Sequence, residues 1–204
     1  MVLLRLIYAA ADWRVHATTR TPLQPGALGA IAGDVVLHAL DVRDAQQIGA
    51  VAQDVATEGI DVLIHNAGVA GRGMSPAEVH RINADAPLRV AQALLAAVVR
   101  SREKKLVLMT SQLGARRGYT GSLGPYGDSK AALNAAFRAH APAWGQCGCL
   151  AIVMHPGWVR TDMGGAGAPV AVEESVRGMR RVIARLTPKD HGRFFTWEGR
   201  EHPW

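Results

Sequence analysis

Short apolar runs alternate with longer amphipathic stretches along this chain, and that alternation constrains its fold more than any other feature. The runs predict strands at 13–19, 34–40, 61–65, 105–110, 150–155 and 193–197. Helices are predicted at 44–58, from about Ser75 onward, over the segment that carries Tyr126 and Lys130, and at 173–186. Strand and helix in this alternation indicate a mostly parallel sheet with helices on both faces. We therefore expect a doubly wound α/β fold that forms a single domain over residues 1–204.

The composition is that of a globular protein. The chain has 204 residues, of which 49% are apolar and 20% charged, enough for one domain with a substantial core. The only cysteines, Cys147 and Cys149, are too few for a disulfide framework or a zinc site, and we expect both to be small buried residues.

Net charge and hydropathy favour neither a nucleic-acid partner nor a membrane span. The formal charge is +6, but the basic residues are dispersed, and Glu103 interrupts their densest run, 100–105. That run is typical of a solvated helix end. The apolar opening VLLRLIY is too short to cross a bilayer and lacks the features of a signal peptide. We expect a cytoplasmic protein.

Polar or turn-forming residues follow three of the predicted strands. Asn66 follows 61–65, Ser111 follows 105–110, and Pro156-Gly157 follows 150–155. In open parallel sheets, ligands bind outside the carboxyl ends of the strands. These residues therefore predict a binding site at one edge of the sheet.

Tyr126 and Lys130 are four residues apart, which places them on one face of a helix. A nearby ammonium group favours the ionised form of a phenol, so we expect the pKa of Tyr126 to be lowered. Tyr126 would then exchange protons near neutral pH. Alone, Tyr126 is more typical of a surface tyrosine after Pro125. The presence of Ser111 and Asn83 favours the catalytic interpretation.

Five motifs in this order resemble the short-chain dehydrogenase/reductase family, from about Val2 to the C-terminus. They are Asn66-Ala67-Gly68, Asn83 in RINADAP, Ser111 in MTSQLG, Tyr126-x-x-x-Lys130, and Pro156-Gly157 followed by Val159 and Thr161. The segments HPGWVRTDMGG and GRFFTWEGREHPW further resemble the C-factor group, which is linked to intercellular developmental signalling in some bacteria. The resemblance implies a Rossmann-like fold and an NAD(P)-dependent oxidoreductase.

The resemblance also implies a role for each catalytic residue. Tyr126 would transfer a proton to or from the substrate oxygen, while Lys130 lowers its pKa and holds the nicotinamide ribose. Ser111 would hydrogen-bond the substrate carbonyl, and Asn83 would order a water molecule that links Lys130 to solvent; as a purely structural alternative, Asn83 could cap or kink its helix. His65 and His155 are expected to be satisfied strand-end histidines, and Trp197 is expected to be a core or subunit-contact aromatic residue, like Trp204.

The implied cofactor site holds residues from most of the chain, and no metal. Its members are Arg20, Asp41, Val42, Asn66, Ala67, Gly68, Tyr126, Lys130, Pro156, Gly157, Val159 and Thr161. Arg20 lies where the family reads the adenine ribose, and the segment HATTR contains no acid. Arginine suits the 2′-phosphate of NADP, so the sequence favours NADP over NAD. Arg20 could equally be a surface residue in a turn before Pro22.

The family's first strand and glycine-rich phosphate loop have no counterpart here. Residues 2–11 resemble the second half of the helix that normally follows that loop. The run Val2–Tyr8 is not the missing parallel strand, because a parallel crossover needs a dozen or more residues. Three alternatives remain open: the sheet closes up, another segment fills the gap, or the protein begins further upstream.

Two functions remain open at this stage. The first is an oxidoreductase that interconverts a small carbonyl compound and an alcohol. The second is a non-catalytic signalling or interaction protein of the C-factor type, with weak or no cofactor binding. We also expect a homo-oligomer (dimer or tetramer), a mobile glycine-rich loop after Pro156, and an early end or a kink in the Tyr126 helix at Pro142.

Overall fold

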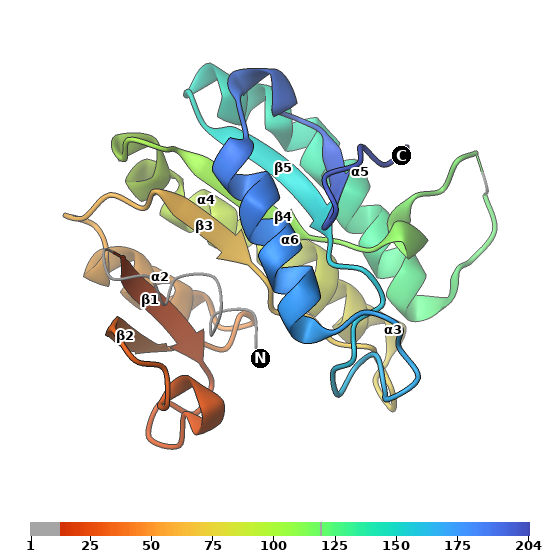
Figure 1. Cartoon of the computed structure of the whole chain (residues 1–204), viewed down its shortest axis with the longest axis horizontal. Helices are drawn as coiled ribbons and strands as arrows, with labels where there is room; N and C mark the ends of the chain where they lie inside the picture. The colour runs from red at the N-terminus through yellow and green to blue at the C-terminus, as the bar shows by residue number, and fades with distance from the viewer. Residues whose placement is uncertain (1–12, 119) are drawn as a thin grey trace.

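The computed structural model describes residues 13–118 and 120–204, and its strands form two parallel sheets (Figure 1). The first sheet pairs β1 (Arg14–Thr19) with β2 (Asp34–Ala39). The second has the order β3 (Val62–His65), β4 (Lys105–Met109), β5 (Leu150–His155) and β6 (Phe194–Thr196). All six predicted strands are confirmed within one or two residues at each end.

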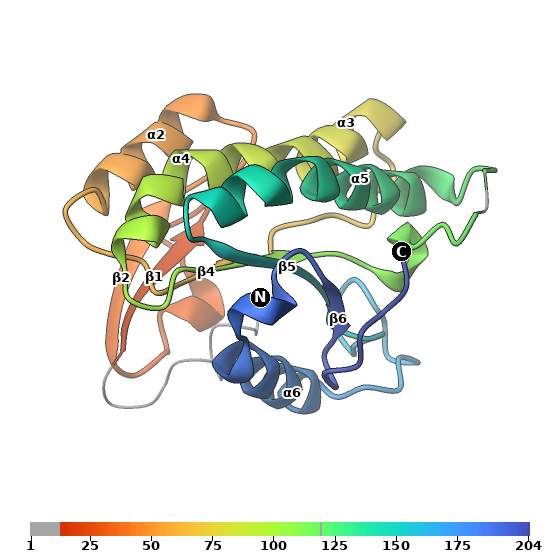
Figure 2. The same ribbon diagram turned by 90° about the horizontal axis from the view of Figure 1, so that it is seen from above.

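Helices cover both faces of these sheets, as the alternating pattern predicted. Helices α2, α3, α4 and α5 lie above the strands in Figure 2, and α6 lies below them. Their bounds are α2 (Ala45–Asp54), α3 (Pro76–His80), α4 (Ala86–Arg100), α5 (Gly124–Gln146) and α6 (Val172–Arg185). Short turns of helix add η1 (Gly26–Leu28), the π-helical η2 (Arg81–Asp85), η3 (Gln112–Gly114) and η4 (Pro188–Asp190). This is a doubly wound, Rossmann-like α/β fold.

The core divides into two layers because alternate strand residues point to opposite faces. On one side, Leu106 and Leu108 of β4 join Leu133 and Phe137 of α5. On the other, Val107 and Met109 join residues of α6 such as Met179. All five residues of β4 are buried, as expected for a central strand of a parallel sheet.

No strand joins β1 to β3 in the part of the chain that the structure describes. The alternative in which the sheet closes up is therefore wrong for this structure. A third apolar cluster connects the two sheets instead: Ile48 and Val51 of α2 pack with Val90 and Leu94 of α4. The helix expected at residues 2–11 lies outside the described residues.

The long helix expected from Ser75 is a helical stretch whose middle is a π turn. Ser75 begins it with a capping box, since its side chain accepts from the Glu78 N–H and Glu78 accepts from the Ser75 N–H. At η2, the N–H of Ala86 bonds to the carbonyl of Arg81, five residues back. The stretch Pro76–Arg100 is long and apolar enough to cross a membrane, but 56% of its most apolar window is buried inside the protein.

Helix α5 continues past Pro142, so the expected early end is wrong, while the alternative of a kink at this proline stays a prediction. The helix continues to Gln146, and Trp144 is buried beyond the proline. His191 supports this part of the helix: its Nδ1 accepts from the Ala151 N–H (3.1 Å), and its Nε2 donates to the Ala141 carbonyl (2.9 Å).

The two cysteines differ in exposure, so the expectation that both are buried is wrong for one of them. Cys149 is buried next to β5, whereas Cys147 follows the last turn of α5 and is exposed.

Candidate active site

The carboxyl ends of β3, β4 and β5 meet at one edge of the four-stranded sheet, because these strands are parallel and adjacent. Asn66 and Pro156 follow β3 and β5 directly, and Ser111 lies two residues after β4. The edge therefore gathers residues that are far apart in the sequence, as predicted.

Ser111 and Tyr126 contact each other across this edge. Ser111 begins η3, where its Oγ accepts from the N–H of Leu113 (3.2 Å). Tyr126 lies in the first turn of α5, close enough to Ser111 for that hydroxyl to lower the pKa of the phenol. Gly114 permits the close packing of η3 on α5, since a Cβ there would lie 2.7 Å from the carbonyl oxygen of Lys130.

Burial raises the pKa of Tyr126, and its hydrogen bond with Ser111 offsets this only in part. The expected lowering of that pKa by Lys130 is wrong for this structure. Lys130 Nζ lies 5.9 Å from the centre of the Tyr126 ring and donates to the carbonyl of Met109 at 2.9 Å. The phenol therefore keeps its proton at neutral pH.

Lys130 is itself almost wholly buried, with 5% of its surface exposed. Burial lowers its pKa to about 8, because the apolar surroundings disfavour the ammonium form. Its only hydrogen bond among the described residues is the one to Met109 at the end of β4. The side chain thus forms the floor of the site beneath Tyr126.

Asn83 joins three segments of the site and is fully buried. Its Oδ1 accepts from the N–H of Val69 (2.9 Å), and its Nδ2 donates to the Val69 carbonyl (2.9 Å) and to Ser129 Oγ (3.0 Å). Ser129 Oγ donates in turn to the carbonyl of Tyr126 (2.7 Å). Asn83 therefore fixes the loop after β3 against the helix that carries Tyr126. Its expected ordering of a water molecule stays a prediction.

Gly68 lies directly beside these residues. A Cβ on Gly68 would lie 3.1 Å from Asn83 Oδ1 and 3.7 Å from Lys130 Nζ. The turn formed by Asn66, Ala67 and Gly68 therefore follows the floor of the site closely, while Asn66 and Ala67 remain exposed.

His65 and His155 are not the satisfied strand-end histidines that were expected. His65 Nε2 is buried without a hydrogen-bond partner among the described residues, as is Nδ1 of His155. Burial lowers the pKa of His65 to about 3, with a further contribution from Lys130. Burial and the neighbouring His202 lower the pKa of His155 to about 4. Both imidazoles are neutral at physiological pH.

The segment after β5 is held by hydrogen bonds at both ends. Ser175 Oγ of α6 donates to the carbonyl of Pro156 (2.6 Å). Gly157 has a φ of +89°, and a Cβ there would lie 2.8 Å from Trp197 Nε1, so no other residue fits easily. Further along, Val159 forms a bridge with Val170, and Thr161 Oγ1 accepts from the N–H of Gly164 (3.1 Å). The mobility expected for this loop stays a prediction.

A second polar group lies at the ends of β1 and β2. Arg43 binds Asp41 through its guanidinium and lowers the pKa of that carboxyl to about 2. Arg20, exposed after β1, also contributes to this lowering, so it lies near the same carboxylate. Val42, which lies between Asp41 and Arg43 in the chain, is half-buried. Arg43 was missed in the sequence, because nothing but its neighbour Asp41 indicates it.

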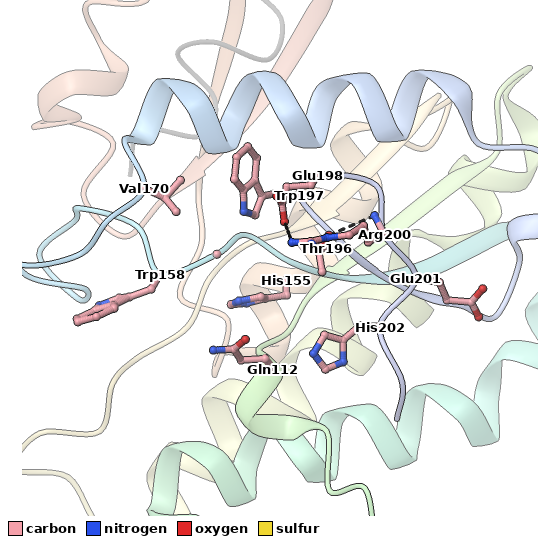
Figure 3. Close-up of a pocket in the computed structure, with 11 residues that line it drawn as sticks. Gln112, His155, Trp158, Val170, Thr196, Trp197, Glu198, Arg200, Glu201 and His202 are labelled. Carbon is pink, nitrogen blue, oxygen red and sulfur yellow. Dashed lines mark hydrogen bonds and ion pairs between the residues drawn. The ribbon is translucent and has the colours of Figure 1, made fainter.

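A cavity of about 400 Å³ adjoins the site on the side of β6 (Figure 3). Gln112 and Gly157 border it, together with His155 and the C-terminal turn that includes Arg200. Trp197 lines this cavity and packs only partly into the core, which refines its expected role. Trp204 is likewise half-buried and packs against Phe137 and Phe194.

Comparison with known proteins identifies the family. A profile of the family described as enoyl-(acyl carrier protein) reductase, a branch of the short-chain dehydrogenases, matches residues 8–197. The chain belongs to the short-chain dehydrogenase/reductase family.

Similar proteins within this family include both a signal protein and carbonyl reductases. The C-signal of Myxococcus xanthus is 41% identical over 164 residues, which is 76% of this chain and 99% of that protein. The carbonyl reductase Sniffer of D. melanogaster has a TM-score of 0.87 at 26% identity, covering 98% of this chain and 94% of its own. NADPH-bound carbonyl reductase from chicken fatty liver has a TM-score of 0.80 at 31% identity, covering 94% and 88%.

The short-chain dehydrogenase pattern is thus assembled in space, in two groups. Ser111, Tyr126, Lys130, Asn83 and Gly68 converge at the ends of β3 and β4. Arg20, Asp41 and Val42 form a separate group at the ends of β1 and β2. Within 13–118 and 120–204, no group of three or more histidine, cysteine or acidic side chains is placed to hold a metal ion.

Proposed function

We propose that this protein is an NAD(P)-dependent oxidoreductase that interconverts a small carbonyl compound and its alcohol. The observation that carries the proposal is the proximity of the Tyr126 phenol to the Ser111 hydroxyl, with the buried Nζ of Lys130 5.9 Å from the centre of the phenol ring. A phenol and a hydroxyl that converge on one point can both bind a single substrate oxygen.

The raised pKa of Tyr126 suits it to the reductive direction, since the phenol holds a proton that it can donate. Ser111 would orient the carbonyl oxygen by a hydrogen bond, and Tyr126 would protonate that oxygen as negative charge develops on it. Lys130, beneath the ring, would stabilise the phenolate that remains. Asn83 would hold Ser129, and through it the first turn of α5, in place.

The residues present fit a nicotinamide cofactor at its two ends. The bound cofactor supplies the hydride that adds to the carbonyl carbon. Pro156, Gly157, Val159 and Thr161 would line the carboxamide end, and Asn66, Ala67 and Gly68 the ribose beside Lys130. Gly68 and Gly157 carry no side chain into this site; a Cβ would crowd Asn83 at 3.1 Å in the first case and clash with Trp197 at 2.8 Å in the second.

We propose NADP as the preferred cofactor. Asp41 and Val42 would border the adenine, with Arg20 and Arg43 at the ribose. Two guanidinium groups near one carboxylate leave positive charge in excess, which suits the 2′-phosphate of NADP. The NADPH-bound carbonyl reductase from chicken supports this choice by similarity.

The decisive experiment measures oxidation of NADPH and NADH by the purified full chain with a panel of small ketones and aldehydes. We expect turnover, and we expect Tyr126→Phe to reduce kcat by at least about 100-fold, the contribution of one general acid. Folding of the variant is checked by circular dichroism, and Leu23→Ala, at a 97% exposed position, serves as the control. Absence of cofactor binding and of turnover in the parent protein would refute the proposal.

A second function is supported by the 41% identity to the C-signal over nearly its whole length. In this alternative the protein acts as a signal or interaction protein and catalysis is dispensable. Tyr126→Phe separates the two, because the phenol is needed for proton transfer and not for the fold. If the variant keeps signalling activity in a developmental assay, the alternative gains support; if it loses that activity while remaining folded, the enzymatic function is the relevant one.

A further inference from the structure

The cavity beside the active site contains two free hydrogen-bonding groups. The side-chain amide of Gln112 is exposed and has no hydrogen bond among the described residues; of the two nitrogens of His155, Nδ1 is buried without a partner, which leaves Nε2 to bind a ligand. Both side chains line the cavity and lie close together in Figure 3. A ligand that hydrogen-bonds the Gln112 amide and His155 Nε2 would give both groups a partner inside the cavity.

The cavity also has aromatic walls. Trp158 is 56% exposed, yet its orientation is fixed because its indole N–H donates to the carbonyl of Gly164 (2.9 Å). Trp197 lines the cavity as well, and in Figure 3 the chain around His155 runs between its indole and the side chain of Gln112. Tryptophan offers a large rigid face at a small loss of conformational freedom. These walls suit a flat, π-bonded group.

The charged groups around the cavity are already paired. Arg200 binds Glu198, and Glu201 binds Arg193 at 3.2 Å. His155 is neutral at physiological pH, because burial lowers its pKa to about 4. Each arginine and glutamate that lines the cavity therefore has an ion-pair partner, which favours an uncharged ligand.

The cavity borders the chain neighbours of the reacting groups, although Ser111 and Tyr126 are not themselves among the residues that line it. Gln112 follows Ser111 in the chain, and Gly157 follows Pro156. A substrate whose carbonyl lay against Ser111 and Tyr126 would thus extend past Gln112 into the cavity. Its volume of about 400 Å³ falls within the range of small-molecule sites and holds a ring-sized group.

We propose that the substrate is an uncharged aromatic carbonyl compound whose ring carries a hydrogen-bonding oxygen, bound by Gln112 and His155 beside the face of Trp158. This inference rests on the proposed reductase function and assigns the substrate class of that site. Gln112 and His155 act as specificity residues, and Trp158 provides the platform for the ring.

The test compares kcat/KM for benzaldehyde, meta-hydroxybenzaldehyde and meta-carboxybenzaldehyde in the full chain and its variants. We expect Gln112→Leu to lower the value for the hydroxylated aldehyde about 2- to 10-fold relative to benzaldehyde. Trp158→Ala should lower both about 3- to 10-fold relative to cyclohexanecarbaldehyde, and Trp158→Phe should restore most of the loss. Ratios between enzymes cancel the intrinsic reactivity of each aldehyde.

Two results would overturn the proposal: a preference for the carboxylated aldehyde, or substrate ratios that neither variant changes. A separate binding arm distinguishes failure of the reductase function. If no aldehyde is reduced, ligand-observed NMR with meta-hydroxybenzyl alcohol and benzyl alcohol tests the cavity directly. Tighter binding of the hydroxylated alcohol that is lost in Trp158→Ala and Gln112→Leu supports the cavity assignment without catalysis; no binding refutes both.

Discussion

Replacing Asn83 with alanine should destabilise the protein by about 2–4 kcal/mol, because the change leaves the N–H and the carbonyl of Val69 without partners. Each unsatisfied buried group costs about 1–3 kcal/mol. Because Val69 is only half-buried, we take about 1–2 kcal/mol for each of its two backbone groups. Ser129 Oγ keeps its bond to the Tyr126 carbonyl and adds little. With a urea slope of about 2 kcal/mol per M, the unfolding midpoint should fall by about 1–2 M.

Two controls separate the lost hydrogen bonds from the lost volume. Asn83→Asp keeps the size but replaces the donating amide by an oxygen, and we expect it to be at least as destabilising as alanine. Asn134 is a buried asparagine on α5 with a single hydrogen bond, from Thr110 Oγ1 at 2.6 Å, and its Nδ2 has no partner. Asn134→Ala should therefore have the smaller effect. A loss below about 1 kcal/mol for Asn83→Ala, or an Asn83→Asp variant as stable as the parent, would contradict this reasoning.

Three further changes test the electrostatics. The pKa of His65 falls to about 3 on folding, so below about pH 6.5 the unfolded state binds a proton that the folded state does not. The free energy of unfolding therefore decreases as the pH falls from 7 to 5. His65→Asn should remove about 2 kcal/mol of that decrease, as measured by urea titrations at the two pH values. The pKa of Lys130 falls to about 8, so the folded state releases its proton at lower pH than the unfolded state does. The free energy of unfolding should therefore rise by about 2 kcal/mol from pH 8 to pH 10, relative to that of Lys130→Met. If the two proteins showed the same dependence of stability on pH, the burial of Lys130 would be refuted. Arg43→Gln should weaken NADPH binding about tenfold and NADH binding much less, as measured by calorimetry, and equal effects would exclude a 2′-phosphate contact.

The layered fold was predictable from the sequence because it depends on local patterns. Each strand is a short apolar run that ends in a polar residue or a turn, so the strands β1 to β6 and the edge where Asn66 and Ser111 meet follow from periodicity alone. Tyr126 and Ser111 were brought together by the topology of parallel strands and a following helix. Spacing and strand order are enough for these features.

The features that were not predictable depend on contacts between distant segments. Lys130 was expected to face the phenol, but the carbonyl of Met109 at the end of β4 binds its ammonium group. Helix α5 was expected to end early or to kink at Pro142, but it continues, and His191, from a turn 49 residues later in the chain, supports it. Arg43 was overlooked because its part in the site depends on where β1 and β2 place Arg20. No local pattern encodes these partners.

The π turn η2 has a consequence for how such a site tolerates insertion and deletion. An α-helix advances by about 100° per residue, so a π turn, which holds one extra residue, rotates everything before it relative to everything after it. Ile82, Asn83 and Ala84 are all buried in succession, which a single face of an α-helix could not accommodate. Deleting one residue from Arg81–Asp85 would restore an unbroken apolar helix and turn the amide of Asn83 away from Val69. A change that leaves composition and hydropathy almost untouched would thus disconnect the loop after β3 from the helix that carries Tyr126.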